Sequence, residues 1–152
     1  GRYEEAEPLY RRAMAISETM LGLGHPEYAT CLNKFAVLLE KQGKPEEAEK
    51  LCRHAMAITE ITLGKHHPAY VSSLNNIAES LETQGKYQEA ELLYRQAMTL
   101  AEATLGPDHP NFSNDLGNLG GVLRKQGKLE ETIPLYHQAE TVASAALGLD
   151  HP

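Results

Sequence analysis

Two adjacent histidines, His66 and His67, stand beside a proline in the segment LGKHHPAY (63–70). Imidazole nitrogens can bind zinc or act as a general base, but polar residues before a proline also occur where a helix begins. The dipeptide His-Pro recurs at positions 25, 67, 109 and 151, each time 42 residues further on. A zinc site needs ligands that converge on one point, whereas residues one repeat apart lie on successive turns of an array. The recurrence therefore favours a structural role, and we predict no metal site and no cofactor.

The other candidates for catalysis also have structural explanations. Cys52 and His54 are two residues apart on a predicted helix, so their side chains point to different faces. Cys52 stands where the other copies carry tyrosine, which indicates a core position. The run GNLGG that starts at Gly117 lies inside a helical pattern and has no strand before it, so it is not a phosphate-binding loop. We therefore predict no catalytic residues and no enzyme.

Charge and hydropathy narrow the classes of partner. The 152 residues carry a formal net charge of −7 and no basic run, which argues against nucleic acid or an anionic membrane as the main partner. No apolar stretch reaches the length needed to span a bilayer, and no secretory signal pattern opens the chain. Cys31 and Cys52 are not spaced as a disulfide framework. We expect a soluble, cytoplasmic protein.

A period of 42 residues positions all of these side chains. Glycine recurs at 1, 43, 85 and 127, and the pair Leu-Gly recurs at 21, 63, 105 and 147. A fixed period of this size is the signature of a repeat array, which grows by stacking units. The period predicts helix B of a partial repeat at 1–24 and complete repeats at 25–66, 67–108 and 109–150. We expect the two ends to be cut points in a longer array.

Each repeat is predicted to form two helices. In the second copy, apolar residues follow the spacing i, i+3, i+4, i+7 from Leu74, which places one stripe on a helix face. This first helix, helix A, is expected at about 68–83, where the Gly85 turn ends it. Helix B is expected to follow directly and to end near Leu105, with alanines alternating with large residues on its buried side. The chain is therefore predicted to be all-α, with seven helices.

The histidines fit the boundary between repeats. Gly64 would stop helix B, Pro68 would occupy the first position of the next helix A, and His67 would be its N-cap. A ring nitrogen of histidine can accept from a free backbone N–H there, although histidine is not among the usual capping residues. The opening segment is thus interpreted as a helix boundary.

These repeats resemble the tetratricopeptide repeat, in the 42-residue version seen in kinesin light chains and related proteins. The resemblance rests on LNNIAESLETQGKYQEAELLYRQAMTLAEATLGPDHP (74–110) and its copies, and it covers essentially the whole chain. The family's helix B pattern matches at Ala90, Tyr94 and Ala97. Leucine stands at 32, 74 and 116, where the ordinary 34-residue repeat often has tryptophan.

The resemblance implies a right-handed superhelical solenoid of antiparallel helix pairs whose A helices line a concave groove. Such grooves bind extended or helical peptides of a protein partner. Counted from each repeat's glycine, the expected groove positions are Thr30, Asn33, Val37, Glu40 and Lys41, then Ser72, Asn75, Glu79, Glu82 and Thr83, then Asn114, Gly117, Gly121, Arg124 and Lys125.

Two groups of groove positions carry specific expectations. Asn33 and Asn75 occupy the place where similar proteins use an asparagine to hold the peptide backbone, since an amide both donates and accepts; a solvated polar face is an equally good alternative. Gly117 and Gly121 lie on one face of helix A, where each costs about 1 kcal/mol relative to alanine. These glycines either form a bare strip for a bulky ligand side chain or result from sequence drift. We favour drift.

The leading function is a non-catalytic protein-interaction scaffold that binds a peptide in the groove. Charge in this groove is mixed, with Glu79 and Glu82 beside Arg124 and Lys125, unlike the basic cargo grooves of kinesin light chains. One alternative is head-to-tail self-association through exposed end helices, the last of which carries Ile133, Leu135, Val142 and Leu147. Another is the regulatory or sensor arm of a larger signalling ATPase.

Overall fold

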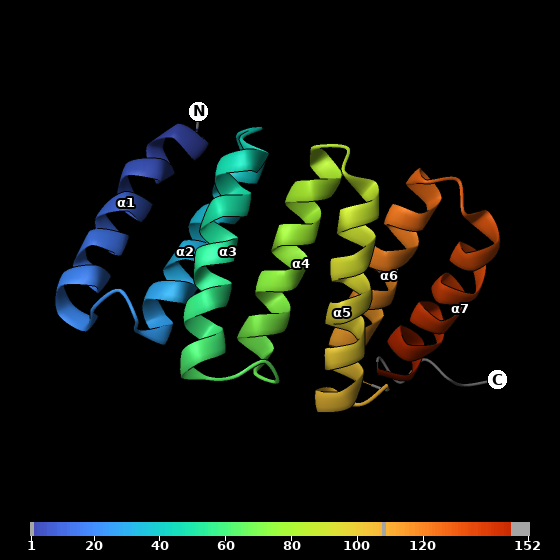
Figure 1. The fold of residues 1–152 in the computed structure, drawn as a ribbon. Helices are drawn as coiled ribbons and strands as arrows, with labels where there is room; N and C mark the ends of the chain where they lie inside the picture. The colour runs from blue at the N-terminus through green and yellow to red at the C-terminus, as the bar shows by residue number, and fades with distance from the viewer. Residues whose placement is uncertain (1, 108, 147–152) are drawn as a thin grey trace.

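The computed structural model describes residues 2–107 and 109–146, and within these ranges it contains seven α-helices and no strand. Figure 1 shows the helices side by side in chain order, with α1 and α7 at opposite ends of the array. The all-α prediction and the number of helices are confirmed. The helices are α1 (Arg2–Leu21), α2 (Pro26–Lys41), α3 (Pro45–Thr62), α4 (Pro68–Thr83), α5 (Tyr87–Leu105), α6 (Pro110–Lys125) and α7 (Leu129–Ala146).

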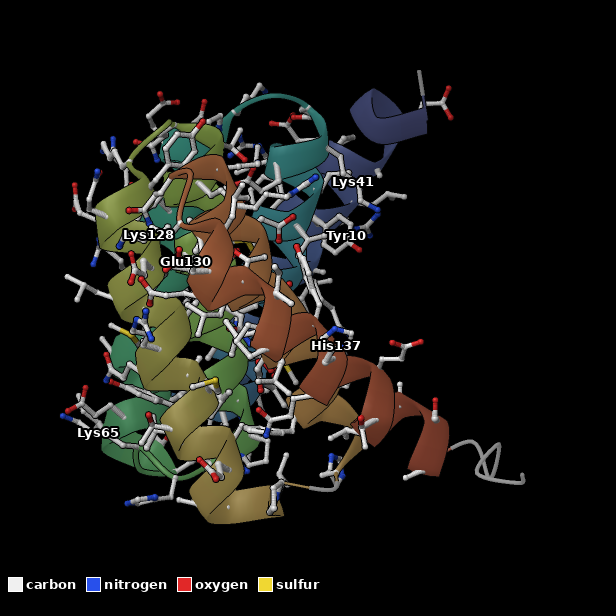
Figure 2. All side chains as sticks on the ribbon, turned by 90° about the vertical axis from the view of Figure 1, so that its right-hand side faces the viewer. Tyr10, Lys41, Lys65, Lys128, Glu130 and His137 are labelled. Carbon is white, nitrogen blue, oxygen red and sulfur yellow. The ribbon has the colours of Figure 1, made fainter. Side chains whose placement is uncertain are left out.

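The helices form an array in which each one packs against the next along the chain. The helices expected as A are α2, α4 and α6, and those expected as B are α1, α3, α5 and α7. Helices α2 and α4 also touch, so consecutive A helices lie along one side of the solenoid. Figure 2 looks at the array from its C-terminal end and places Lys41, which ends α2, and Lys65, which follows α3, on opposite sides. The division into repeats at particular residues stays a prediction.

The boundaries follow the predicted chemistry. His67 Nδ1 accepts from the backbone N–H of Ala69 at 3.1 Å, and His25 Nδ1 accepts from that of Glu27 at 3.2 Å. Pro26 and Pro68 each begin a helix directly after the capping histidine. The glycine of each A-to-B turn has a positive φ of 74° to 78°, the left-handed conformation that disfavours any side chain. The motif at 151–152 lies outside the described residues.

Small residues bring the helices of a pair together. Ala90 and Ala97 of α5 are fully buried and pack in the core, as the alternation of small and large residues predicts. Gly120 has the same role in α6, because a Cβ there would lie 2.8 Å from Cε1 of Tyr136 on α7. Cys52 is also fully buried, which confirms its interpretation as a core residue.

A recurring carboxylate joins each helix pair to the next. Glu7, Glu49 and Glu91 occupy equivalent positions, 42 residues apart, on successive B helices. They accept side-chain hydrogen bonds from the A-to-B turn that follows: Glu7 from Lys44 (3.4 Å), Glu49 from Gln84 (2.8 Å), and Glu91 from Gln126 (2.7 Å) and Lys128 (2.6 Å). Figure 2 shows Lys128 at the start of α7, beside Glu130. The equivalent residue of α7 is Ile133, which is largely exposed.

One expectation about the last helix is wrong. The sequence places Val142 on an exposed apolar face, but the residue is buried in a core cluster with Phe112 and Leu116 of α6. Leu135 is half-buried against the same cluster, and Ile133 is exposed as expected. The period of 3.6 residues explains the error, because Val142 and Ile133 lie nine residues apart and therefore on different parts of the helix surface. Leu147 lies outside the described residues.

Candidate functional site

Most of the groove positions predicted from the sequence reach the surface of the A helices. Two sets can be distinguished by the burial of the whole residue. The exposed set is Thr30, Val37, Lys41, Ser72, Glu79, Thr83, Asn114, Arg124 and Lys125. The half-buried set is Asn33, Glu40, Asn75, Glu82, Gly117 and Gly121.

The two asparagines link successive A helices. Asn33 of α2 donates from Nδ2 to Ser73 Oγ of α4 at 2.9 Å, and Asn75 of α4 donates from Nδ2 to Asp115 Oδ1 of α6 at 2.6 Å. The two bonds are equivalent, since each runs 40 residues forward in the chain. Each Oδ1 atom is buried and accepts no hydrogen bond within the described structure. The amides therefore have a structural task that sequence reasoning missed, and contact with a peptide backbone stays a prediction.

Two pockets lie between α4 and α6, and Asn75 lines both. The first, which we call the Asp115 pocket, has a volume of about 260 Å³. It is formed by the N-terminal halves of α4 and α6 and by the end of α5. Its lining residues are Pro68, Val71, Ser72, Asn75, Ala101, Thr104, Leu105, Asn114 and Asp115.

Asp115 is the charged group of this pocket. The residue is only 4% exposed, and its one hydrogen bond within the described structure is the bond from Asn75. Burial raises the pKa of Asp115, and the Asn75 amide only partly opposes this effect. Sequence reasoning did not select Asp115. The available signal was a carboxylate at a buried helix A position where the other copies have Cys31 and Ser73.

The second pocket, which we call the Glu79 pocket, has a volume of about 330 Å³. The Lys125 ammonium lies 2.8 Å from Oε1 of Glu82, and the hydroxyl of Tyr94 donates to Oε2 of Glu82 at 3.1 Å. Partial burial and the carboxylates of Glu40 and Glu82 raise the pKa of Glu79. The pocket is lined by Asn75, Asn76, Glu79, Glu82, Thr83, Tyr94, Asn118 and Lys125.

The structure thus brings together part of the predicted set. Some of the predicted groove positions line one or both pockets, and the acidic and basic residues that indicated a mixed groove include a direct ion pair between Glu82 and Lys125. The positions that line a pocket are Ser72, Asn75, Glu79, Glu82, Thr83, Asn114 and Lys125. The positions that line neither of these two pockets are Thr30, Asn33, Val37, Glu40, Lys41, Gly117, Gly121 and Arg124.

The glycines of α6 fall into two kinds. A Cβ added at Gly117 or Gly121 would meet no atom within 4 Å, so no neighbouring side chain or backbone requires glycine there. Both residues have helical backbone angles, unlike the turn glycines. Gly120 faces Tyr136 instead. Both glycines therefore leave room for a Cβ on the surface of α6, which is consistent with a bare strip and also with drift.

The described residues include no evident group for covalent catalysis or metal binding. Burial raises the pKa of the Cys52 thiol to about 12, helped by the carboxylates of Glu40 and Glu79, so the nucleophilic thiolate is disfavoured. Within 2–107 and 109–146, no three histidine, cysteine or carboxylate side chains gather as metal ligands would. None of the helices in this part of the chain has the length and hydropathy to cross a membrane.

The architecture is that of an all-α repeat solenoid with two pockets between neighbouring A helices. Family models described as tetratricopeptide repeat match residues 1–50, 32–103 and 116–152. The chain therefore belongs to the tetratricopeptide repeat family.

Solved structures agree with this assignment. BtubC (BKLC) from P. vanneervenii superimposes with a TM-score of 0.86 and 22% identity, covering 100% of this chain and 60% of its own. A Podosopora anserina protein named as a kinesin light chain, with nearly identical TPR-like repeats, has a TM-score of 0.77 and 25% identity, over 96% of this chain and 69% of its own. A point variant of that protein has a TM-score of 0.80. The chain thus spans 60% of the length of BtubC. A search of curated proteins finds no match.

Proposed function

We propose that this chain is a non-catalytic scaffold that binds a peptide segment of a protein partner along the A-helix side of the solenoid. The observation that carries the proposal is the pair of pockets between α4 and α6, which share Asn75. The Glu79 pocket is lined mainly by polar side chains, and the Asp115 pocket by both polar and apolar ones. An extended peptide places side chains on alternate faces, so two neighbouring pockets suit successive side chains on one face. The proposed function needs no cofactor, and we propose a cytoplasmic location.

The open strip on α6 allows a test that leaves the core untouched. Replacing Asn75 with alanine would also remove the hydrogen bond to Asp115, so lost binding would have two explanations. Gly121→Leu instead adds a large side chain at a position where a Cβ would meet no atom within 4 Å, and Gly121→Ala adds only a methyl group at the same position. Gly121 lies one helical turn from both Asn118 and Lys125, which line the Glu79 pocket. The leucine variant should therefore obstruct the surface beside that pocket, and loss of a glycine from the helix interior should keep or raise stability.

The experiment is selection of peptides from an unbiased display library by the unmodified chain, followed by affinity measurement on both variants. We expect specific peptides, a loss of affinity in Gly121→Leu, and near-normal affinity in Gly121→Ala. Circular dichroism confirms that each variant is folded. If selected peptides bind both variants with equal affinity, the peptide does not use this part of the A-helix side.

A second candidate function is self-association. Apolar side chains of α1 favour it, since Leu9, Ile16 and Met20 are 67%, 54% and 76% exposed. Such side chains can form an interface with another copy. Light scattering over a wide range of protein concentrations tests this candidate, and a monomer mass at every concentration removes it.

A further inference from the structure

The Asp115 carboxylate lacks a compensating charge in the described structure. Its residue is 4% exposed, and the group that donates to it is a neutral amide, Nδ2 of Asn75. Among the described residues, no lysine, arginine or histidine forms an ion pair with it, in contrast to Glu82, which pairs with Lys125. A buried carboxylate without a cation is costly, because burial removes it from water without replacing the lost solvation.

Asp115 also lines a pocket of about 260 Å³ that opens to the surface between α4 and α6. Ser72, Thr104 and Asn114, which also line this pocket, are exposed residues with oxygen atoms that accept hydrogen bonds. The wall also contains apolar groups from Val71, Ala101 and Leu105. This combination of apolar wall, acceptor oxygens and a carboxylate matches a long side chain with a cationic end.

We infer that the Asp115 pocket receives the side chain of a lysine or arginine from the partner peptide, with its ammonium or guanidinium group beside the Asp115 carboxylate. The inference rests on the proposed function and specifies the chemistry of the peptide. A divalent metal ion fits the pocket less well, since its lining contains a single carboxylate and calcium requires six to eight oxygen ligands. The neighbouring Glu79 pocket adds Glu79 and Glu82 to the same side of the array.

The third repeat differs from the other copies at the position of Asp115, and this difference supports the inference. The positions equivalent to Asp115 are Cys31 and Ser73, both uncharged and both compatible with the fold. A carboxylate is therefore not required to pack helix A. Ser73 also accepts the hydrogen bond from its asparagine, so the link between A helices does not need a charge either. The charge remains to be explained, and a cationic ligand group explains it.

The first test is a titration with single blocked amino acids, followed by NMR of the Asn75 side-chain amide. The probes are the N-acetyl, C-amide derivatives of lysine and arginine. Norleucine and citrulline in the same form are their uncharged counterparts, and all four are compared at constant ionic strength. We expect saturable shifts of the Asn75 amide signals with lysine or arginine, and no comparable shift with norleucine or citrulline.

Asp115→Asn is the decisive variant, because the amide oxygen can still accept from Asn75 while the charge is lost. Replacing a charge-assisted contact with a neutral one should weaken binding of the cationic probe by about tenfold. Glu89→Gln removes the same charge from an exposed position on α5 and controls for net charge. Equal binding by Asp115→Asn and the unmodified chain, or no saturable shift at the solubility limit of the probes, overturns the inference.

The peptide library separates this inference from the proposed function. Selection should enrich lysine or arginine at one peptide position, and selection on Asp115→Asn should lose that preference and keep the rest of the motif. Enriched peptides without a basic position overturn the inference and leave the proposed function intact. A library that enriches nothing counts against the proposed function. The titration with single blocked amino acids then decides by itself whether the Asp115 pocket binds a cationic side chain.

Discussion

Three glycines of α6 should respond differently to the same substitution. Gly117→Ala and Gly121→Ala add a methyl group where no atom lies within 4 Å, in helical backbone that alanine prefers. Gly120→Ala adds the same group 2.8 Å from the ring of Tyr136, closer than carbon atoms can approach. The three variants therefore share their helix propensity and differ only in the space available.

The expected change in the free energy of unfolding follows from helix propensity alone, since a Cβ added at Gly117 or Gly121 meets no atom within 4 Å. Each change should stabilise the fold by about 1 kcal/mol. Helix propensities are summed along a helix, so the double variant should gain about 2 kcal/mol, or roughly 4 to 8 °C in melting temperature for a chain of this length. In Gly120→Ala, displacement of Tyr136 offsets the gain, and we expect a chain no more stable than the original.

Urea denaturation followed by circular dichroism measures the free energy of unfolding of the original chain and of each variant. Unchanged dependence on urea is the control that the surface exposed on unfolding is the same. Two results would refute the reasoning. One is destabilisation by Gly117→Ala or Gly121→Ala, which would mean that the strip is occupied or strained. The other is equal stabilisation by Gly120→Ala, which would mean that the Tyr136 contact does not restrict this position.

Four further predictions test the electrostatics and the helix ends. Burial raises the pKa of Glu91, but hydrogen bonds from Lys128, Gln126 and Arg95 outweigh burial and lower this pKa from 4.5 to about 2. Ionised Glu91 therefore contributes about 3 kcal/mol to the free energy of unfolding. This contribution is complete above pH 4.5 and is lost as the pH falls towards 2. Urea denaturation across this range should show a smaller loss for Glu91→Gln. Burial raises the pKa of Asp115, so its ionisation costs stability as the pH rises through and above the ordinary range of aspartate; Asp115→Asn should therefore be more stable than the original chain at neutral pH and lose this advantage in acid, as denaturation at both pH values would show. His67→Ala should lower the melting temperature by removing an N-cap worth roughly 0.5 to 1 kcal/mol, and His67→Ser should restore it. Cys52 should react with a thiol reagent far more slowly than Cys31 in the folded chain, with equal rates after unfolding, as timed labelling and mass spectrometry would reveal.

Much of the fold was predictable because the period marks every helix boundary. The prolines, capping histidines and turn glycines are local signals, and each acts within a few residues of its own position. They predicted α4 at Pro68–Thr83, the bounds that the structure has. The family resemblance added the arrangement of helices, which local signals do not contain.

The candidate site was less predictable, since it depends on contacts between repeats. The spacing of Asn33 and Asn75 indicates a shared face but cannot reveal that each amide reaches the next A helix. Asp115 was missed for the same reason, because its burial and its partner come from α4 and α5 rather than from its own helix. Patterns within one helix predict which face is buried, whereas the partners on that face come from residues about 40 positions away.

The divergence of α6 distinguishes the framework of this array from the side that we propose as the binding surface. The framework residues recur: Pro begins the A helices, a left-handed glycine follows each of them, and Gln126 and Lys128 bind Glu91 much as Gln84 binds Glu49. Other A-helix positions do not recur, and in α6 two glycines and a buried aspartate replace the residues of α2 and α4. Because the framework contacts run through caps, turns and B-helix carboxylates, these A-helix positions can change without loss of the stacking that supports them. A repeat array can therefore acquire a particular ligand preference one helix at a time, and we propose that this chain carries its own preference on α6 and the neighbouring face of α4.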